Sequence, residues 1–99
     1  MDRPMLDDVL LILRSRQEAT RANRFKIVGV FGSVARGDAG PDSDVDILIE
    51  ATDTQASLFD MGAVWSDLHE ALGRWVDIVE LEALRPGFRE TVERDLVRL

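Results

Sequence analysis

Two short apolar runs, rich in β-branched residues, flank a turn with three glycines, and this arrangement most constrains the fold. The runs are Phe25–Phe31 (FKIVGVF) and residues 44–50 (DVDILIE), and the turn between them reads GSVARGDAGPDS. Runs of this length and composition are typical of buried strands. The turn has room for one helical turn before Gly40-Pro41 breaks it into a loop. Strands buried in this way need helices to cover their sheet.

Helical periodicity in two further segments predicts such covering layers. Over residues 4–22 the apolar residues recur every three or four positions, with Asp2 or Arg3 at the start of the helix. Over residues 58–72 the apolar residues form one stripe, and Gly73 follows in the usual position of a helix C-cap.

The rest of the chain supplies one more strand and one more helix. A strand is predicted at residues 75–81 (WVDIVEL), and Pro86 opens a last helix. The chain is therefore predicted to form a single domain over residues 1–99, with an α/β (α+β) fold and the element order α-β-(short α)-β-α-β-α. An apolar fraction of 45% favours a folded globule over a disordered chain.

Composition limits the partners and the compartment. The chain has no cysteine, which excludes disulfides and thiolate metal sites and makes a reducing cytoplasm the expected location. Its longest uncharged apolar run, residues 9–13, is far too short to span a bilayer, and the N-terminus does not resemble a signal peptide. The net charge of −7 disfavours direct DNA binding, so we expect a metal-bound small anion or another protein as partner.

Three carboxylates occupy unusual places. Asp44 and Asp46 are two residues apart on a predicted strand and therefore project from one face. Asp77 lies inside the third predicted strand, where a lone acid is costly. If that strand neighbours the second one, the three side chains converge, and such oxygen ligands suit a hard divalent cation such as Mg²⁺.

A phosphate-binding turn precedes these acids. Gly32 and Ser33 directly follow a predicted strand and open the short helical turn. Such a turn offers free N–H groups and a hydroxyl to a phosphate. Together with the acids and a metal, it indicates an enzyme that moves a nucleotidyl or phosphoryl group.

Other polar residues have simpler interpretations. The acids of the loops and of the strand ends are expected to be solvated, and residues 89–98 are expected to form a salt-bridged helix face. The segment DSDVD imitates the start of a calcium loop, but Ile47 stands where that loop requires glycine. Arg36 either binds a phosphate or pairs with a loop acid, and both alternatives remain open. The solvated acids are Asp38, Asp42, Asp53, Glu50, Glu80 and Glu82.

The single histidine and the tryptophans are interpreted as packing residues. His69 lies between Leu68 and Glu70 on a helix and is expected at the surface or in packing, not as a base or metal ligand. Trp65 and Trp75 are expected in the core or on an apolar face for a partner, rather than as platforms for base stacking.

The pattern of Gly32-Ser33, ten residues, then Asp44-Val45-Asp46 resembles the signature of the minimal nucleotidyltransferases, within the DNA polymerase β-like nucleotidyltransferase superfamily. The run GSVARGDAGPDSDVDILIE is similar to that family almost residue for residue. The run LGRWVDIVELEALRP resembles its later segment and places the third carboxylate of the family on Asp77. The resemblance extends from Phe31 to the C-terminus.

This resemblance implies a mixed sheet flanked by helices and a Mg²⁺-dependent transfer of NMP, most simply AMP from ATP, with release of pyrophosphate. Gly32 and Ser33, with Arg36, would bind the triphosphate. Asp44 and Asp46 would bind the two metals and contribute to nucleotide binding. Asp77 would complete the metal site on the attacking hydroxyl.

The resemblance also implies a partner. Small proteins of this family often act as antitoxins beside a helical HEPN ribonuclease, and some silence it by attaching AMP to a tyrosine. No second domain is expected here to cover the base or bind an acceptor, so a partner is expected to present the acceptor. Two alternatives remain: transfer to a small molecule such as an aminoglycoside, or neutralisation of the partner by contact alone.

Overall fold

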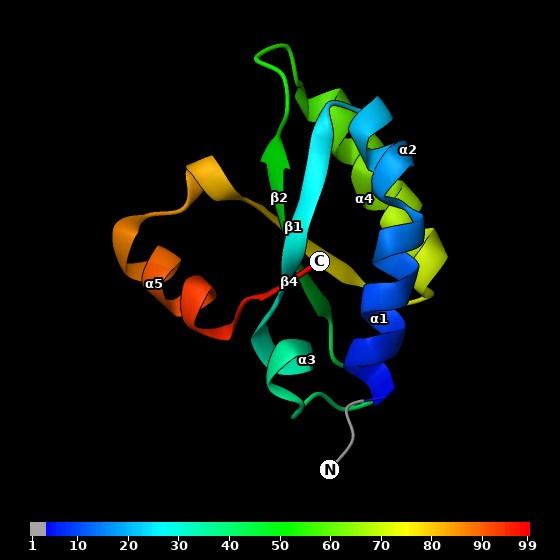
Figure 1. Ribbon diagram of the computed structural model, residues 1–99, viewed down its shortest axis with the longest axis vertical. Coiled ribbons are helices and arrows are strands. Elements are labelled where there is room, and N and C mark those ends of the chain that lie inside the picture. Colours follow the sequence, from blue (N-terminus) through cyan, green and yellow to red (C-terminus); the bar gives the residue numbers. More distant parts are fainter. Residues whose placement is uncertain (1–3) are drawn as a thin grey trace.

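A four-stranded mixed sheet with the strand order β3-β2-β1-β4 forms the middle layer of the molecule (Figure 1). β2 pairs antiparallel with β1 and parallel with β3, and β4 pairs antiparallel with β1. The computed structural model describes residues 4–99. Its strands are β1 (Phe25–Phe31), β2 (Val45–Ala51), β3 (Val76–Glu80) and β4 (Val97–Arg98).

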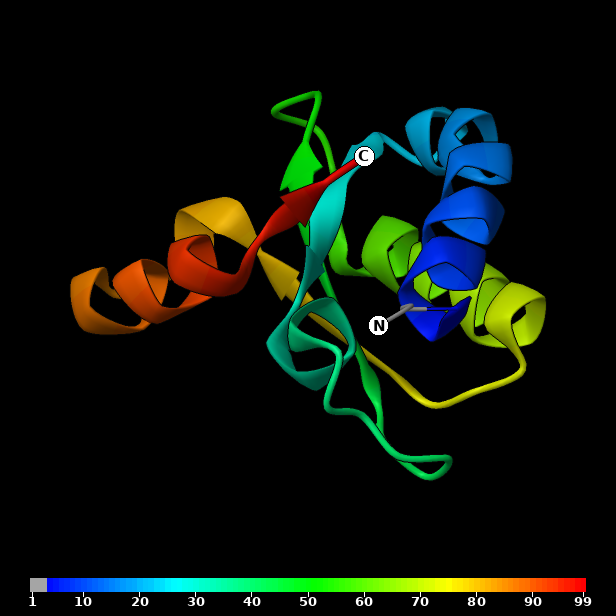
Figure 2. The same cartoon turned by 60° about the horizontal axis from the view of Figure 1, so that its bottom comes forward.

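Helices cover both faces of this sheet, as the sequence and the family resemblance predict. Figure 2 shows α1 (Pro4–Ser15), α2 (Gln17–Ala22) and α4 (Leu58–Leu72) on one face and α5 (Pro86–Asp95) on the other. The short helix α3 (Gly32–Arg36) continues directly from the end of β1.

The alternation of side chains along β2 separates two apolar clusters. Val45, Ile47 and Ile49 are fully buried in the larger cluster, which includes residues of α1 and α4. Leu48 points to the opposite face, where it joins the smaller cluster with Val92 of α5. Because side chains two apart share a face, Asp46 lies on the α5 face of the sheet.

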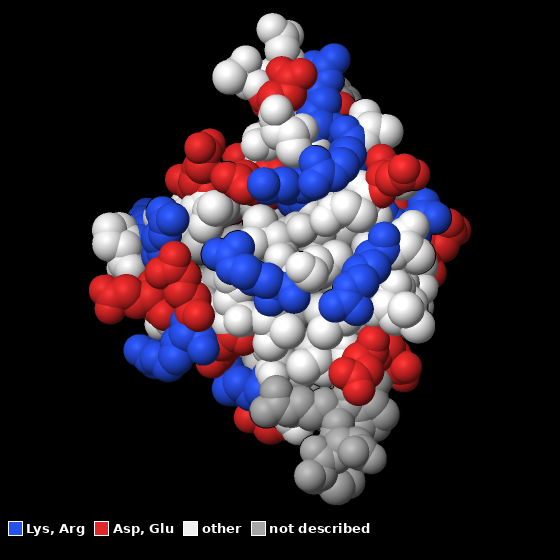
Figure 3. Space-filling view, in the orientation of Figure 1, with Lys and Arg blue, Asp and Glu red and all other residues white. Residues whose placement is uncertain are grey.

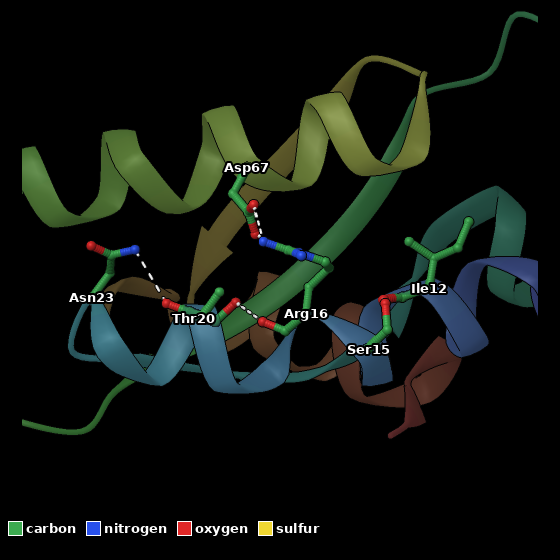
Figure 4. Close-up of polar contacts among 7 residues, drawn as sticks. Ile12, Ser15, Arg16, Thr20, Asn23 and Asp67 are labelled. Atoms are coloured by element: carbon green, nitrogen blue, oxygen red, sulfur yellow. Dashed lines mark hydrogen bonds and ion pairs between the residues drawn. The ribbon is translucent and has the colours of Figure 1, made fainter.

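The first predicted helix, residues 4–22, is in fact two helices separated at Arg16. The amide of Arg16 donates to the carbonyl of Leu13, three residues back, and the Ser15 hydroxyl donates to Ile12 O at 2.6 Å. The guanidinium of Arg16 binds both carboxylate oxygens of Asp67 on α4 (Figure 4). This bidentate pair ties the break to a neighbouring helix, which helical periodicity alone does not reveal.

The other predicted elements are confirmed with small changes at their ends. The predicted bounds of β1 and α4 agree with the structure, Gly73 caps α4 with a left-handed φ of 65°, and Pro86 opens α5. The second strand begins at Val45, so Asp44 precedes it, and the third is shorter by one residue at each end. The predicted start of the first helix at Asp2 or Arg3 lies outside the described residues.

Two elements escape the sequence prediction. A 3₁₀ turn, Leu81–Ala83, follows β3, and the short strand β4 returns along β1. β4 can approach β1 because residue 29 is a glycine. A Cβ at that position would collide with the carbonyl oxygen of Val97. Within residues 4–99, no helix has the length and apolar character needed to cross a membrane.

Candidate active site

The parallel pairing of β2 with β3 places Asp46 directly opposite Asp77. Residues paired in register on adjacent strands share a face, so both carboxylates lie on the α5 side of the sheet. Asp44 is exposed and stands one residue before β2. The structure therefore brings together two of the predicted acids as strand neighbours and places the third beside them in the chain.

Gly32 begins α3 at the end of β1 and lies against the Asp46 side chain. Its φ of 76° falls in the left-handed region that favours glycine. A Cβ at this position would collide with Oδ2 of Asp46. Only glycine therefore lets the turn approach the carboxylate so closely.

An open cleft of about 370 Å³ joins these parts. It lies between the sheet, α3 and α5, and Phe88 and Thr91 of α5 contribute to its wall. Its lining residues are Phe31, Gly32, Ser33, Arg36, Asp46, Asp77, Val79, Phe88, Thr91 and Asp95. Every predicted site residue except Asp44 lines this cleft.

The cleft concentrates negative charge around Asp46. Burial first, and then the neighbouring charges of Asp77 and Asp44, raise the pKa of Asp46 from 3.8 to about 6. Arg36 opposes this shift by favouring the ionised carboxylate. The positive charge of Arg36 thus offsets the negative charge around Asp46 only in part.

The donor set suits a divalent cation by its chemistry. Asp44, Asp46 and Asp77 supply only oxygen ligands. A bound hard cation would relieve the repulsion between their negative charges. Among residues 4–99, however, no three acidic, histidine or cysteine side chains are already grouped as a metal-binding set. The predicted convergence is thus seen for Asp46 and Asp77, and Asp44 acts on Asp46 only through its charge.

Arg36 makes two ion pairs, one with a loop acid and one with α5. Its Nε lies 3.3 Å from Asp38, and its Nη1 lies 2.7 Å from Asp95 of α5. These hydrogen bonds, with Asp95 the stronger influence, raise the pKa of Arg36 above its usual value. Pairing with a loop acid is therefore observed, and Arg36 also lines the cleft where a phosphate would enter. Sequence reasoning missed the role of Asp95 in the cleft, because it assigned residues 89–98 to a salt-bridged helix face.

Arg74 holds the loop that leads to Asp44. Its Nη2 lies 2.8, 2.7 and 2.8 Å from the carbonyl oxygens of Gly40, Pro41 and Ser43. The side chain reaches these groups because it follows the Gly73 cap, where the chain turns from α4 toward β3. An arginine after a helix cap gives no sequence signal of this role.

The remaining predicted residues have structural surroundings. Asp38, Asp42 and Asp53 are exposed, as expected for loop acids. His69 stacks on Trp65 with ring centres 4.8 Å apart, and its Nδ1 lies 2.8 Å from the carbonyl of Arg74. The interpretation of His69 as a packing residue is confirmed.

Comparison with known proteins places this geometry in a family. The polymerase β nucleotidyltransferase family matches residues 16–99. The protein adenylyltransferase MntA of Thermococcus cleftensis is 37% identical over 94 residues, which span 93% of each chain.

Solved structures show the same fold. A minimal nucleotidyltransferase structure is 40% identical and superposes with a TM-score of 0.72 over 88% of this chain and 92% of that chain. A chain of a toxin–antitoxin crystal structure with AMP-PNP, 24% identical, superposes with a TM-score of 0.70 over 87% of this chain and 70% of that one, which shows a shared fold. On the family match and the MntA relative, this chain belongs to the polymerase β nucleotidyltransferase family and is a nucleotidyltransferase.

Proposed function

We propose that this chain is a Mg²⁺-dependent protein adenylyltransferase that transfers AMP from ATP to a hydroxyl of a partner protein. The observation that carries the proposal is the pairing of Asp46 with Asp77 in a cleft that also contains the Gly32-Ser33 turn. A relative 37% identical over nearly its whole length bears the name protein adenylyltransferase. A structure of the same fold comes from a toxin–antitoxin complex with AMP-PNP.

The proposed roles follow from position. Gly32 and Ser33 would hold the triphosphate through backbone N–H groups and the Ser33 hydroxyl. Arg36 lines the same cleft and would contact a phosphate there. Asp44, Asp46 and Asp77 would hold two Mg²⁺ ions, which when bound neutralise phosphate charge and lower the pKa of the attacking hydroxyl. The chain's own contribution is to position the phosphate-binding turn and the three carboxylates close together.

The reaction joins the acceptor to the nucleotide. The acceptor oxygen forms a bond to the α-phosphorus of ATP while the bond from that phosphorus to the bridging oxygen breaks. Pyrophosphate leaves, and the hydroxyl proton passes to solvent. The sequence contains no tyrosine, so transfer to a tyrosine requires a second protein.

The partner that best fits this proposal is a HEPN ribonuclease encoded beside this chain, with the nucleotidyltransferase as its antitoxin and the cytoplasm as their location. The support is the family membership and the toxin–antitoxin origin of a structure with the same fold. The cleft is open on one side, which leaves an acceptor hydroxyl to be positioned by the partner.

Intact-mass spectrometry tests the proposal. The purified chain, ATP and Mg²⁺ are incubated with and without the adjacent HEPN protein. We expect an AMP-sized increase on the partner and none on this chain. Efficient self-labelling on serine or threonine would contradict the antitoxin role. A triple variant, Asp44→Asn, Asp46→Asn and Asp77→Asn, that still neutralised the toxin would instead indicate inhibition by contact.

A further inference from the structure

Asp77 lines a second hollow besides the nucleotide cleft. This hollow, the α4–β3 groove, has a volume of about 420 Å³ and lies between α4 and β3. Leu58, Met61, Gly62 and Trp65 line it at positions i, i+3, i+4 and i+7 of α4, so one stripe of the helix forms its wall. Trp75, before β3, contributes the facing side, and Asp77 is the only ionisable residue in the lining.

Large apolar side chains around this groove are open to solvent. Leu58 is 83% exposed, Phe59 is 91% exposed and Trp75 is 59% exposed. Apolar side chains gathered in this way mark surfaces that bind another protein. β3 is also an edge strand, with β2 on one side, and the groove lies beside it.

Asp77 joins the two hollows. The cleft on the α5 face contains the phosphate turn and Asp46, whereas the groove contains aromatic and aliphatic side chains. We propose that the α4–β3 groove docks the acceptor protein through a largely apolar segment and presents its hydroxyl at Asp77. The inference rests on the proposed adenylyl transfer, because the acceptor must approach the carboxylate from outside the nucleotide cleft.

The observations favour this occupant over two others. A second copy of this chain seated in the groove would cover Asp77 without offering a tyrosine. A nucleobase in the groove would not account for Phe59, which follows the lining residue Leu58 on α4 and is exposed although it does not line the groove itself. With Asp77 as its one charge, the groove suits a segment that carries no acid near the hydroxyl.

The test fills the groove or removes an exposed apolar side chain next to a lining residue. Gly62→Leu fills the groove, and a Cβ there meets nothing within 4 Å, so the helix tolerates the substitution. Phe59→Ser removes the exposed apolar side chain that follows Leu58 on α4. Leu11→Ser is the matched control, because Leu11 is an apolar residue of α1 that is 67% exposed and lies outside the groove. Three quantities are measured: the rate of AMP transfer to the HEPN protein, the Kd for that protein and the thermal shift with Mg²⁺-ATP.

We expect Gly62→Leu and Phe59→Ser to lower the transfer rate and the affinity for the HEPN protein by at least about tenfold. Leu11→Ser should stay within about twofold of the wild type, as a surface substitution outside an interface does. All three variants should keep the thermal shift with Mg²⁺-ATP.

Each other outcome overturns a distinct statement. Unchanged transfer and binding in both groove variants would reject the docking surface and leave adenylyl transfer standing. A lost thermal shift would assign the groove to the nucleobase, and a dimer dissolved by Phe59→Ser in sedimentation would assign it to a second copy. If the wild type binds the HEPN protein without modifying it, the Kd values still decide the docking surface while the proposed activity fails. Neither transfer nor binding by the wild type would overturn both.

Discussion

At the scale of single residues, Asp46 is the carboxylate whose pKa the fold raises most clearly among the described residues. Its carboxylate lies opposite Asp77 and against Gly32, on a strand whose neighbouring residues Val45 and Ile47 are fully buried. Burial of the side chain followed by the charges of Asp77 and Asp44 raises its pKa from 3.8 to about 6. The metal-free folded protein therefore binds a proton at Asp46 more tightly than the unfolded chain does.

The raised pKa of Asp46 predicts a pH-dependent effect of Asp46→Asn on stability. Because the pKa is raised on folding, the contribution of Asp46 to the free energy of unfolding should fall as pH rises from about 4 through 6. Asparagine cannot ionise, so the metal-free variant should be more stable than the wild type by about 1 kcal/mol at pH 7.5, after allowance for solvent screening. The difference should vanish near pH 4.

Urea unfolding in EDTA from pH 4 to pH 8 measures this effect. Asp44→Asn is the matched control, since Asp44 is exposed and lies outside the strand, and a smaller change is expected. A metal-free Asp46→Asn protein less stable than the wild type at pH 7.5 would show that Asp46 makes a stabilising contact instead.

At the scale of elements, the crossover from β2 through α4 to β3 positions two parts of the site, Asp77 and the loop before Asp44. α4 begins with a capping box of Ser57 and Asp60 and ends at Gly73. The next residue, Arg74, then reaches back to three carbonyl oxygens of the loop that precedes β2. One connection thus sets Asp77 beside Asp46 and also fixes the approach to Asp44.

We predict that Arg74→Ala loosens this loop. Loss of charge-assisted hydrogen bonds should lower the free energy of unfolding by about 1.5–3 kcal/mol. A supporting contact of a metal ligand typically accounts for about 10–100-fold in metal affinity. The Mg²⁺ concentration for half-maximal stabilisation by ATP should therefore rise by a factor in that range.

Thermal unfolding during a Mg²⁺ titration at fixed ATP checks the prediction. Arg14→Ala, at an exposed position of α1, controls for loss of one positive charge. If the Arg74 and Arg14 variants required the same Mg²⁺ concentration, the loop contact would have no part in placing Asp44.

At the scale of the whole molecule, charge is unevenly distributed. The chain carries a net charge of −7, yet Figure 3 shows basic side chains across the face that includes α2, β1 and β4. Arg21, Lys26 and Arg98 line a hollow on that side. The cleft between the sheet, α3 and α5 instead contains Asp46, Asp77 and Asp95, with Arg36 as the one cation among its described lining residues, so an unaccompanied triphosphate should be repelled there.

This distribution predicts that ATP stabilises the protein only together with Mg²⁺. At free Mg²⁺-ATP of about 100 times Kd, the free energy of unfolding should rise by about 2.7 kcal/mol. For a domain of this size such a gain raises Tm by roughly 10 °C or more. ATP in EDTA should give little shift, because the acids of the cleft stay uncompensated. Differential scanning fluorimetry measures the shift in Tm. An equal shift with and without Mg²⁺ would place nucleotide binding outside this cleft.

The sequence by itself determined β1, β2 and β3, most of the helices and the types of residue in the site. β-branched runs, helical periodicity and the cap at Gly73 are local signals, since each depends on neighbours along the chain. Tertiary structure decided the rest, because those properties depend on contacts between distant segments. It broke the first helix where Arg16 binds Asp67, and it joined Arg36 to Asp95. It bound Arg74 to the loop that leads to Asp44, formed β4 against Gly29, and set Asp77 in the lining of both the cleft and the α4–β3 groove.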